Sequence, residues 1–410
     1  MGSSLHARLA GTEPVPVAPV PQHGLRVVRL CSVFEPPDGA LDPRFDPIGG
    51  MQNHCAQLVR ALDRRGVHQT VVTTRPPGAP RAHALGQHAE VRRHGLPVPV
   101  ARQLYAAPAA ADVLRAARGA DLLHAHLGED LAVVPVALAA ARASGVPLVL
   151  TIHCSLRHTY APTRRLRSQA LARLGGALEL RGARAARGVI VLTPRLRDRL
   201  TGDGVEGDRI AVVPSGVASA EWATDGRDPL DGTGRPRVVF VGRLARQKGV
   251  TTLVEAAARL RTAGVRVVLV GDGPERRAVE ALIDRHALHD RVTLTGFMPH
   301  RDVPAVLRGA DVVVLPSVYE ELGSVLVEAM KAGAAIVASD TGGIPDAVGD
   351  AAMLVAPGDP SALAAAIDGL LAEPLRAEVL RARARQRSAR FDWDRLAGRV
   401  LDLYWSWARR

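Results

Sequence analysis

The sequence contains few cysteines, few lysines and no long hydrophobic run, and each shortage narrows the class of protein. Only three cysteines occur in 410 residues, Cys31, Cys55 and Cys154. Their odd number and scattered positions argue against both a disulfide framework and a zinc site. We therefore expect neither redox chemistry nor a bound metal.

No apolar segment approaches the roughly 20 residues that a membrane-spanning helix needs. The first residues also lack a positively charged start followed by an apolar block, which a secretory signal would show. A cytoplasmic protein is therefore expected. The length exceeds what one hydrophobic core usually serves, so the chain should form two domains of roughly 150 to 200 residues each.

Lysine occurs only at Lys248 and Lys331, so nearly all of the basic charge behind the formal net charge of +12 is arginine. A basic field attracts polyanions such as nucleic acid or a membrane surface without specificity. Arginine together with abundant Ala, Gly and Pro is also typical of a GC-rich coding sequence. We therefore expect no nucleic-acid partner.

One basic stretch, residues 157–187, stands out from this background. A basic helix of this kind can bind a membrane surface. A solvated helical face is the commoner explanation of such a run, and we favour it over membrane contact. The stretch contains a single acidic residue, Glu179, and the arginines Arg157, Arg164, Arg165, Arg167, Arg173, Arg181, Arg184 and Arg187.

Short apolar, β-branched runs alternate with helical patterns from residue 25, and a second series of the same kind starts near residue 237. Strands that are apolar on both faces predict parallel sheets covered by helices. The expected fold class is α/β, with two Rossmann-like, doubly wound parallel-sheet domains that face each other across a cleft. Ligands of such sheets bind at the carboxyl ends of the strands.

The domain limits follow from composition. Residues 1–23 lack periodicity and are expected to be a disordered leader before a first domain at 24–215. Gly, Asp and Pro concentrate in a linker at 216–236, which precedes a second domain at 237–390. The tail at 391–410 carries three of the four tryptophans and should form a helix that packs back on the first domain.

Two cations flank a predicted helix start after the first strand of the second series. Gly242-Arg243 ends the strand, and Lys248-Gly249 follows within the same loop. The free amide groups and the dipole of a helix N-terminus favour an anion. A compact ammonium also suits a phosphate oxygen at positions too narrow for a planar guanidinium. The loop therefore predicts a diphosphate-binding site, although a capped surface loop would explain the motif if it stood alone.

Two carboxylates follow a later strand, in the segment PSVYEELGSVLVEAM. Gly323 and Ser324 should open a helix, which places Glu328 within the helix and Glu320 on the preceding loop. A carboxylate can accept two hydroxyl hydrogen bonds, as a ribose or a sugar diol requires. Paired carboxylates are also typical of glycoside hydrolases, but a hydrolase does not need the phosphate grip upstream. The neighbouring Glu321 is expected to have no catalytic role.

These motifs together resemble the retaining glycosyltransferases of family 4, which have the GT-B fold. The resemblance extends over residues 25–405 and rests on five motifs in the expected order. They are Gly242-Arg243, Lys248-Gly249, the turn Gly271 to Pro274, the Glu320-x7-Glu328 pair and the loop Gly342 to Asp346.

The resemblance implies a role for each donor-site residue. Arg243 and Lys248 would bind the diphosphate of a nucleotide sugar, Glu328 the ribose and Glu320 the hydroxyls of the donor sugar. Phe297, within Arg291 to Pro299, would flank the uracil or other base. The new bond would form with retention, with no metal or other cofactor, because the two cations neutralise the leaving diphosphate. Gly242, Gly323 and Ser324 complete the expected donor-binding set in this half.

The first half is expected to bind the acceptor. Gly50, in the pair that precedes a helix, resembles the glycine loop of the family, where the backbone approaches the donor diphosphate. Gln52 follows on the first helical turn, and Asp130 follows a strand. His126 and His153 end two strands and should point toward the cleft. We assign His153 a catalytic contact to the donor sugar, and His126 an acceptor-side role beside Asp46, Gln52 and Asp130.

Within the family, the sequence resembles the glycosyltransferases of aminoglycoside antibiotic pathways, which attach glucosamine-type sugars to 2-deoxystreptamine. The segments that carry this likeness are FDPIGGMQ, GVHQTVVTTRPPGAPR, TIHCS followed by Tyr160, and the Glu320 segment with Glu321 where most relatives have Pro. An aminocyclitol is cationic, so Asp46, Glu129 and Asp130 could pair with its amines.

Three further hypotheses stay open at this point. The acceptor could be a lipid, an inositol phosphate or a polysaccharide, as the basic stretch would favour. The chain could be a non-catalytic polyanion-binding protein, for which only its charge argues. An epimerase or phosphorylase could also retain the same motifs.

Overall fold

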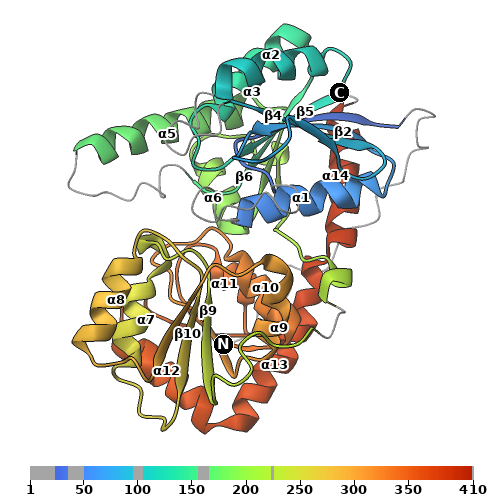
Figure 1. Ribbon diagram of the computed structural model, residues 1–410. Helices are drawn as coiled ribbons and strands as arrows, with labels where there is room; N and C mark the ends of the chain where they lie inside the picture. Colours follow the sequence, from blue (N-terminus) through green and yellow to red (C-terminus); the bar gives the residue numbers. More distant parts are fainter. Residues whose placement is uncertain (1–23, 36–49, 96–104, 156–165, 223–225, 409–410) are drawn as a thin grey trace, which may run out of the picture.

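The computed structural model describes residues 24–35, 50–95, 105–155, 166–222 and 226–408. These residues form two α/β domains, the first at the top of Figure 1 and the second below it. Each domain is built on one sheet whose strands are parallel, apart from a short antiparallel edge pair in the first domain. The expected fold class is therefore confirmed.

The first sheet has the strand order β3-β4-β2-β1-β5-β6-β7-β8. Its strands are β1 (Arg26–Cys31), β2 (His68–Thr74), β3 (Ala82–Ala84), β4 (Ala89–His94), β5 (Leu122–Leu127), β6 (Leu148–Ile152), β7 (Gly188–Val191) and β8 (Ile210–Val212). The accompanying helices are α1 (Gly50–Asp63), α2 (Ala106–Ala117), α3 (Val133–Ser144), α5 (Leu166–Ala185) and α6 (Pro194–Gly202).

The second sheet has the strand order β11-β10-β9-β12-β13-β14. Its strands are β9 (Arg237–Val241), β10 (Arg266–Val270), β11 (Val292–Gly296), β12 (Val312–Leu315), β13 (Ala335–Ser339) and β14 (Met353–Val355). The helices of this half are α7 (Val250–Ala257), α8 (Arg276–Arg285), α9 (Val303–Arg308), α10 (Ser324–Ala332), α11 (Ile344–Val348), α12 (Pro360–Ala372) and α13 (Pro374–Ser388). Helices α7, α8 and α12 cover one face of the sheet, and α9, α10 and α13 cover the other (Figure 1).

The apolar residues of α1 are spaced so that they lie on one buried face of the helix. Cys55, Leu58, Val59 and Leu62 recur at helical spacing in α1 and are at most 1% exposed. The helix ends at Asp63, and Gly66, with a φ of 74°, closes the turn by donating its amide to the carbonyl of Asp63 at 2.9 Å. Gly66 thus closes the turn at the end of this helix, because glycine adopts the left-handed conformation without steric cost.

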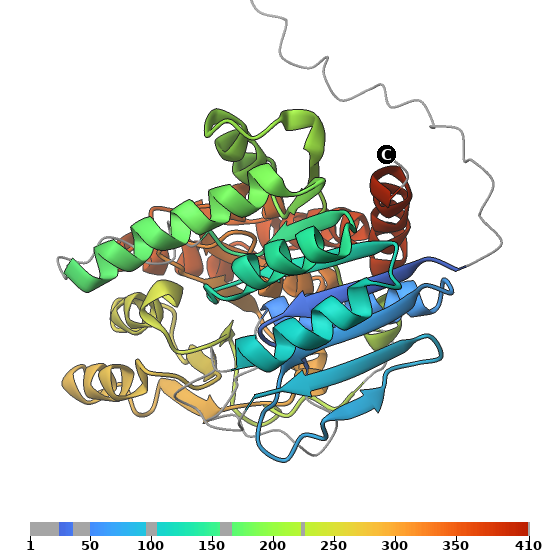
Figure 2. The same ribbon diagram turned by 90° about the horizontal axis from the view of Figure 1, so that it is seen from above.

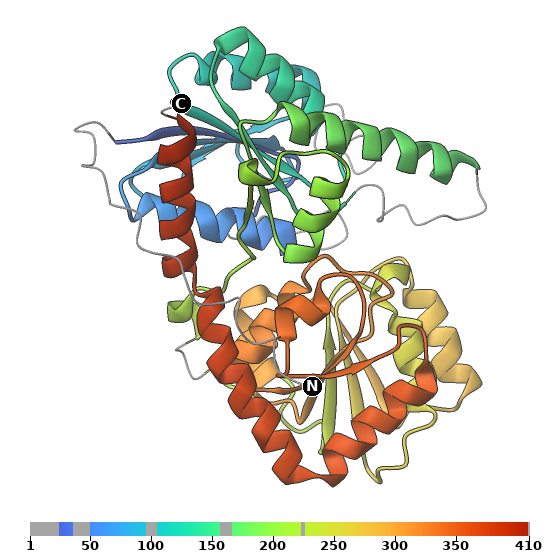
Figure 3. The same cartoon turned by 180° about the vertical axis from the view of Figure 1, so that it is seen from behind.

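The last helix, α14 (Trp393–Ala408), leaves the second domain and packs on the first. Figure 3 shows α13 on the second domain and α14 rising from it along the first. Trp393, Tyr404 and Trp407 are buried in one cluster with Leu58 of α1 and Val149 of β6. The final helix is therefore part of the first domain's core.

The chain crosses between the domains twice, and the two crossings are hydrogen-bonded to each other. The amide of Val217 donates to the carbonyl of Phe391 at 2.8 Å, and the amide of Trp393 donates to the carbonyl of Val217 at 3.2 Å. Much of the expected linker is packed, because Trp222 and Leu230 lie in the core of the second domain. The sequence pattern had indicated only a loose connection here.

Helix α5 carries the described part of the basic stretch and projects beyond the first sheet (Figure 2). Arg173, Arg181 and Arg184 are exposed. Within the described part of this helix, the exposed surface carries one large apolar side chain, that of Leu174, which is 53% exposed. Residues 157–165 lie outside the described residues. This composition is that of a solvated face. Among the described residues, no helix combines the length and apolarity needed to cross a bilayer.

We expect Gly188→Ala to destabilise the first domain. A Cβ at Gly188 would lie 2.2 Å from the indole of Trp407, so β7 and α14 would have to separate. Overpacking of this kind costs about 1 to 3 kcal/mol, which thermal unfolding would register as a lower melting temperature. Gly202→Ala is the matched control, because its Cβ would meet no atom within 4 Å. Equal melting temperatures for both variants would contradict the close packing of α14.

Candidate functional site

In each sheet, the first strand lies between two series of strands that the chain adds in opposite directions. The predicted site lies at the loops that follow these central strands and their neighbours. In the second sheet β9 lies beside β12, although the chain runs from β9 outward to β10 and β11 first. In the first sheet β1 lies beside β5 in the same way. Loops at the carboxyl ends of such strands diverge and leave room for a ligand. The Lys248 loop follows β9, and the Glu320 loop follows β12.

The Lys248 loop is held against the β12 loop by direct backbone contact. Gly249 has a φ of 63°, and a Cβ on it would lie 2.0 Å from the carbonyl oxygen of Pro316. Only glycine fits this approach. Gly249 also separates the short 3-10 turn Arg246–Lys248 from α7, so Lys248 stands immediately before a helix N-terminus.

Lys248 and Glu320 form an ion pair across the two loops. Ser317 donates its hydroxyl to the same carboxylate at 3.4 Å, and the Lys248 and Glu320 side chains are 26% and 16% exposed. The carbonyl of Glu320 accepts the amide of Gly343 at 2.8 Å. The sequence predicted both side chains as ligand contacts, and the structure brings them together.

Arg243 lies in the same loop region but makes no ion pair or hydrogen bond with its side chain to any described residue. The side chain is exposed. Gly242 just before it is packed tightly, because a Cβ on Gly271 would lie 2.0 Å from the Gly242 carbonyl oxygen. The loops after β9 and β10 are thus fixed to each other, while the Arg243 guanidinium stays exposed.

Glu328 lies within α10 and Gly323 immediately before it, as the sequence predicts. Glu328 is 9% exposed, and its carboxylate is 3.2 Å from His300 Nε2. His300 begins the turn that follows the Phe297 segment, and no sequence motif selects it. Phe297 itself is half-buried. The proximity of His300 to Glu328 ties the segment expected to flank the base to the carboxylate expected to hold the ribose.

Two helix N-termini meet between the domains. Gly50 is the first residue of α1, and Ser324 is the first residue of α10. A Cβ on Gly50 would lie 2.8 Å from the Ser324 hydroxyl oxygen, so the two helix starts are in contact. Both ends carry free amide donors and positive dipole ends, which favour a shared anion.

Glu321 joins the two domains, which the sequence did not predict. Its carboxylate oxygen Oε1 accepts the amide of Ser155 from the first domain at 3.1 Å and the Tyr319 hydroxyl at 2.8 Å. Burial raises the pKa of this carboxyl, which is only 6% exposed. The available signal was a Glu at a position where the family resemblance leads us to expect Pro. The expectation of no catalytic role is untested, but the residue has a clear structural contact.

The predicted acceptor residues that the structure describes are buried. Gln52 is 4%, His126 0% and Asp130 8% exposed, and Asp46 lies outside the described residues. Asp130 accepts the amide of Ala132 at 2.6 Å at the start of α3. The expected exit of His126 toward the cleft is therefore wrong, because hydrogen bonds to neighbouring strands hold its ring inside the domain.

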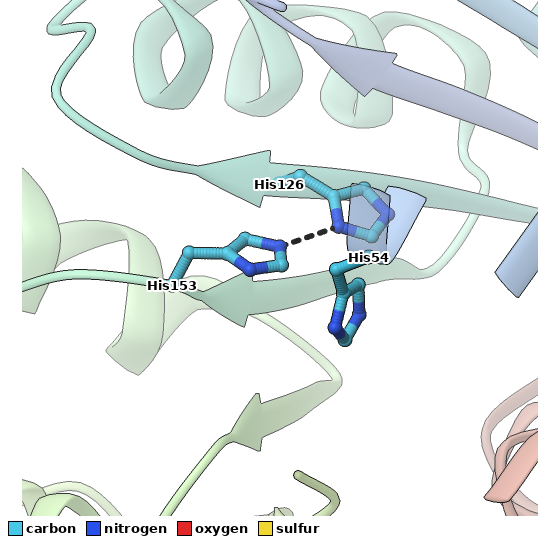
Figure 4. Close-up of side chains that lie close together, drawn as sticks. All are labelled: His54, His126 and His153. Carbon is cyan, nitrogen blue, oxygen red and sulfur yellow. Dashed lines mark hydrogen bonds between the residues drawn. The ribbon is translucent and has the colours of Figure 1, made fainter. Parts of the chain in front are cut away.

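His54, His126 and His153 form a cluster that the sequence did not predict (Figure 4). His126 Nδ1 and His153 Nε2 are 2.9 Å apart, and His54 Nδ1 is 3.1 Å from the Ser215 hydroxyl. One ring nitrogen from each histidine lies within 4.8 Å of the other two, which is close enough for all three to contact a single metal ion. His153, which keeps 9% of its surface exposed, is the cluster member selected from the sequence as catalytic.

The environment of the cluster favours neutral rings. Burial lowers the pKa of His54 and His126 well below the usual value, and the nearby Arg29 guanidinium lowers both further. Burial, with the same cation as the smaller cause, lowers the pKa of His153 to about 3. The charge that disfavours a proton on these rings also disfavours a metal cation between them.

The chain matches two family models. Residues 48–221 match the model Glycosyltransferase Family 4, and residues 226–387 match Glycosyl transferases group 1. Together they include the second sheet, the first sheet apart from β1, and the residues of the second half that are expected to bind the donor.

Curated relatives and a solved structure agree with these models. The 2-deoxystreptamine glucosyltransferase of Streptomyces kanamyceticus is 34% identical over 79% of this chain and 90% of its own length. The 2-deoxystreptamine N-acetyl-D-glucosaminyltransferase of Streptomyces fradiae is 34% identical over 83% and 86%. Anabaena HepE, solved in complex with UDP-glucose, has a TM-score of 0.73 at 21% identity over 93% of this chain and all of its own.

We expect the free energy of unfolding to fall as the pH drops from 7 to 5. The lowered pKa values mean that His54, His126 and His153 stay neutral when folded, whereas they protonate near pKa 6.5 when unfolded. The unfolded chain therefore binds more protons, and each histidine contributes a loss of up to about 1.4 kcal/mol per pH unit below 6.5. Urea unfolding midpoints at several pH values would measure this loss.

His126→Asn should flatten the pH dependence, because it removes one buried titrating ring. His289→Asn is the control, since the His289 side chain is 69% exposed and should leave the slope unchanged. A midpoint that is constant between pH 7 and 5 in the unmodified protein would contradict the neutral cluster.

Proposed function

Because this chain belongs to glycosyltransferase family 4 and has the GT-B fold, we propose that it transfers a sugar from a UDP-sugar to an aminocyclitol, with retention at the anomeric carbon. The sugar is glucose or N-acetylglucosamine, and the acceptor is 2-deoxystreptamine or a similar compound of aminoglycoside antibiotic biosynthesis. The observation that carries the proposal is the Lys248–Glu320 pair beside two converging helix N-termini.

The donor site explains why Lys248 is paired with Glu320. An ammonium group has three N–H donors, so Lys248 can hold the carboxylate and still donate to a phosphate oxygen. Glu320 can accept hydroxyl hydrogens of the sugar with its remaining lone pairs. Lys248 and Glu320 thereby fix the two sides of the bond that breaks, the diphosphate and the sugar.

The proposed transfer needs no metal ion. The bond between the anomeric carbon and the β-phosphate oxygen breaks, and its electron pair goes to the leaving diphosphate. The acceptor hydroxyl oxygen bonds to the same face of the anomeric carbon, and its proton passes to the departing phosphate oxygen. Arg243, Lys248 and the helix starts at Gly50 and Ser324 stabilise the negative charge that develops.

The identities proposed for the nucleotide and the acceptor are supported by neighbouring residues and by similar proteins. The ribose is proposed to bind Glu328, which lies beside His300, and HepE, a protein with the same fold, is seen with UDP-glucose. Two relatives that cover most of this chain are named for 2-deoxystreptamine as acceptor. Of the acidic residues expected to meet its amines, Glu129 is exposed whereas Asp130 is buried, so Glu129 is the better described candidate.

The proposed function is tested by incubating the protein with 2-deoxystreptamine and a panel of UDP, GDP and ADP sugars in the presence of EDTA. We expect a monoglycosylated product, detected by mass, with UDP-glucose or UDP-N-acetylglucosamine. Absence of product with every donor would contradict the aminocyclitol proposal. Product that forms only without EDTA would contradict the metal-free mechanism.

Lys248→Ala and Glu320→Ala should each lower kcat by about 10²- to 10³-fold, as the loss of a charge-stabilising contact does in other enzymes. Lys331→Ala is the matched control. It removes the other lysine, whose Nζ lies 2.8 Å from the Ser219 hydroxyl, away from the Lys248 and Glu320 loops. Circular dichroism would verify that all three variants fold. Full activity in both site variants would refute the site assignment.

A further inference from the structure

Arg29 is a buried arginine at the centre of the first domain. It lies on β1, its side chain is fully buried, and among the described residues it has no carboxylate partner. All four terminal N–H groups are used. NH1 is 2.9 Å from His124 Nδ1 and 2.8 Å from His126 Nε2, and NH2 is 2.9 Å from Gln69 Oε1 and 3.2 Å from the Tyr404 hydroxyl. An unpaired buried charge is costly and suggests a function.

The bond to His126 decides where that ring carries its proton. A guanidinium can only donate, so the Nε2 atom of His126 must accept. A neutral imidazole has one N–H, which is then on Nδ1 and donates to His153 Nε2 at 2.9 Å. By the same rule, the single N–H of His153 is on Nδ1. Arg29 thus determines the tautomer of a ring that it does not touch.

The other hydrogen-bond partners of Arg29 are also consistent with Arg29 as the donor. Gln69 donates its amide to the Val59 carbonyl at 2.9 Å, which leaves its oxygen for Arg29. The guanidinium can only donate, so His124 Nδ1 must accept, and its one lone pair faces both Arg29 and the Tyr404 hydroxyl. The N–H of His124 is therefore on Nε2 and donates to the Thr151 hydroxyl at 2.7 Å. The network has one consistent set of donors and acceptors, with one branch to His153 and another to Thr151.

The His153 branch ends at the junction with the second domain. His153 follows β6, and Ser155, two residues later, donates its amide to Glu321 beside Glu320. Among the described residues His153 Nδ1 has no hydrogen-bond partner, so its N–H is available to a ligand there. The ring also stays neutral at physiological pH, because its pKa is about 3. It can therefore donate a hydrogen bond, but it is a poor base.

We propose that Arg29 and His126 are positioning residues that fix His153 as its Nδ1–H tautomer, so that this ring donates to an oxygen of the bound donor sugar. The role in sugar binding rests on the proposed function. The tautomer itself rests only on the hydrogen-bond geometry. Glu320 would then accept hydroxyl hydrogens of the sugar while His153 donates to an oxygen.

A metal ion held by His54, His126 and His153 is the competing explanation of the cluster. It would need the lone pair of His126 Nδ1 or Nε2, but the former faces His153 and the latter is occupied by Arg29. The guanidinium would also lie one hydrogen bond away from the cation. The geometry therefore favours the hydrogen-bond relay.

The first test is nitrogen NMR of histidine-labelled protein, which reports which ring nitrogen carries the proton. We expect His153 to be protonated on Nδ1, as His126 should also be. His126→Leu should remove this preference, and His126→Asn should keep it, because the asparagine amide still places a donor near the Nδ1 position. A His153 proton on Nε2 in the unmodified protein would overturn the proposal. Binding of one Zn²⁺ ion per protein that shifts the nitrogen signals of these histidine rings would also overturn it.

The second test is kinetic. His126→Leu and Arg29→Met should lower kcat/KM for the donor about tenfold through loss of one oriented hydrogen bond. His126→Asn and Arg29→Lys should restore most of it. Replacing a buried charge by an apolar side chain of similar volume usually leaves a protein folded.

Thr151→Val is the matched control, because it breaks the other branch of the same network in the same core. It should lower stability but change kcat/KM less than about twofold. Equal losses in Thr151→Val and His126→Leu would show a merely structural role and overturn the proposal. If the unmodified protein transfers no sugar yet shows the Nδ1 tautomer, the proposed function fails while the tautomer assignment stands.

Discussion

The ion pair between Lys248 and Glu320 connects the two loops on which the proposed donor site depends. It joins the ends of β9 and β12, the neighbouring strands at which the chain order of the second sheet reverses. The contact between Gly249 and the Pro316 carbonyl brings the same loops to a distance at which the pair can form. The helix that starts at Ser324 then meets Gly50 of the first domain, so the position of the pair also sets where the domains touch.

Much of the fold and the donor half of the site could be predicted from the sequence because their signals are local. Apolar runs that alternate with helical patterns specify parallel sheets, whatever the contacts between them. Lys248, Glu320 and Glu328 lie in short motifs next to predicted strand ends and helix starts. The carboxyl ends of parallel strands meet at one edge of a sheet, so residues there come together without further information.

The rest depended on pairings between distant segments. Arg29 stands in an apolar strand, and its contacts with His124 and His126 arise because β1 pairs with β5, 95 residues later. His300 was missed because no motif in the surrounding sequence indicates that it lies beside Glu328, 28 residues later. His126 was expected to point toward the cleft, since a strand end alone does not reveal the arginine on the neighbouring strand that holds its ring inside.

The hydrogen-bonded crossings at Val217 and Phe391 restrict how the two domains can move. A single connecting segment would allow the domains to twist, slide and separate, whereas two segments joined side by side act as one strip. The simplest motion left is rotation about an axis through that strip. On such a path the rim farthest from the axis travels most and the residues beside the axis travel least. Such a rotation would separate the two domains most on the side away from the crossings and leave the crossings themselves unchanged.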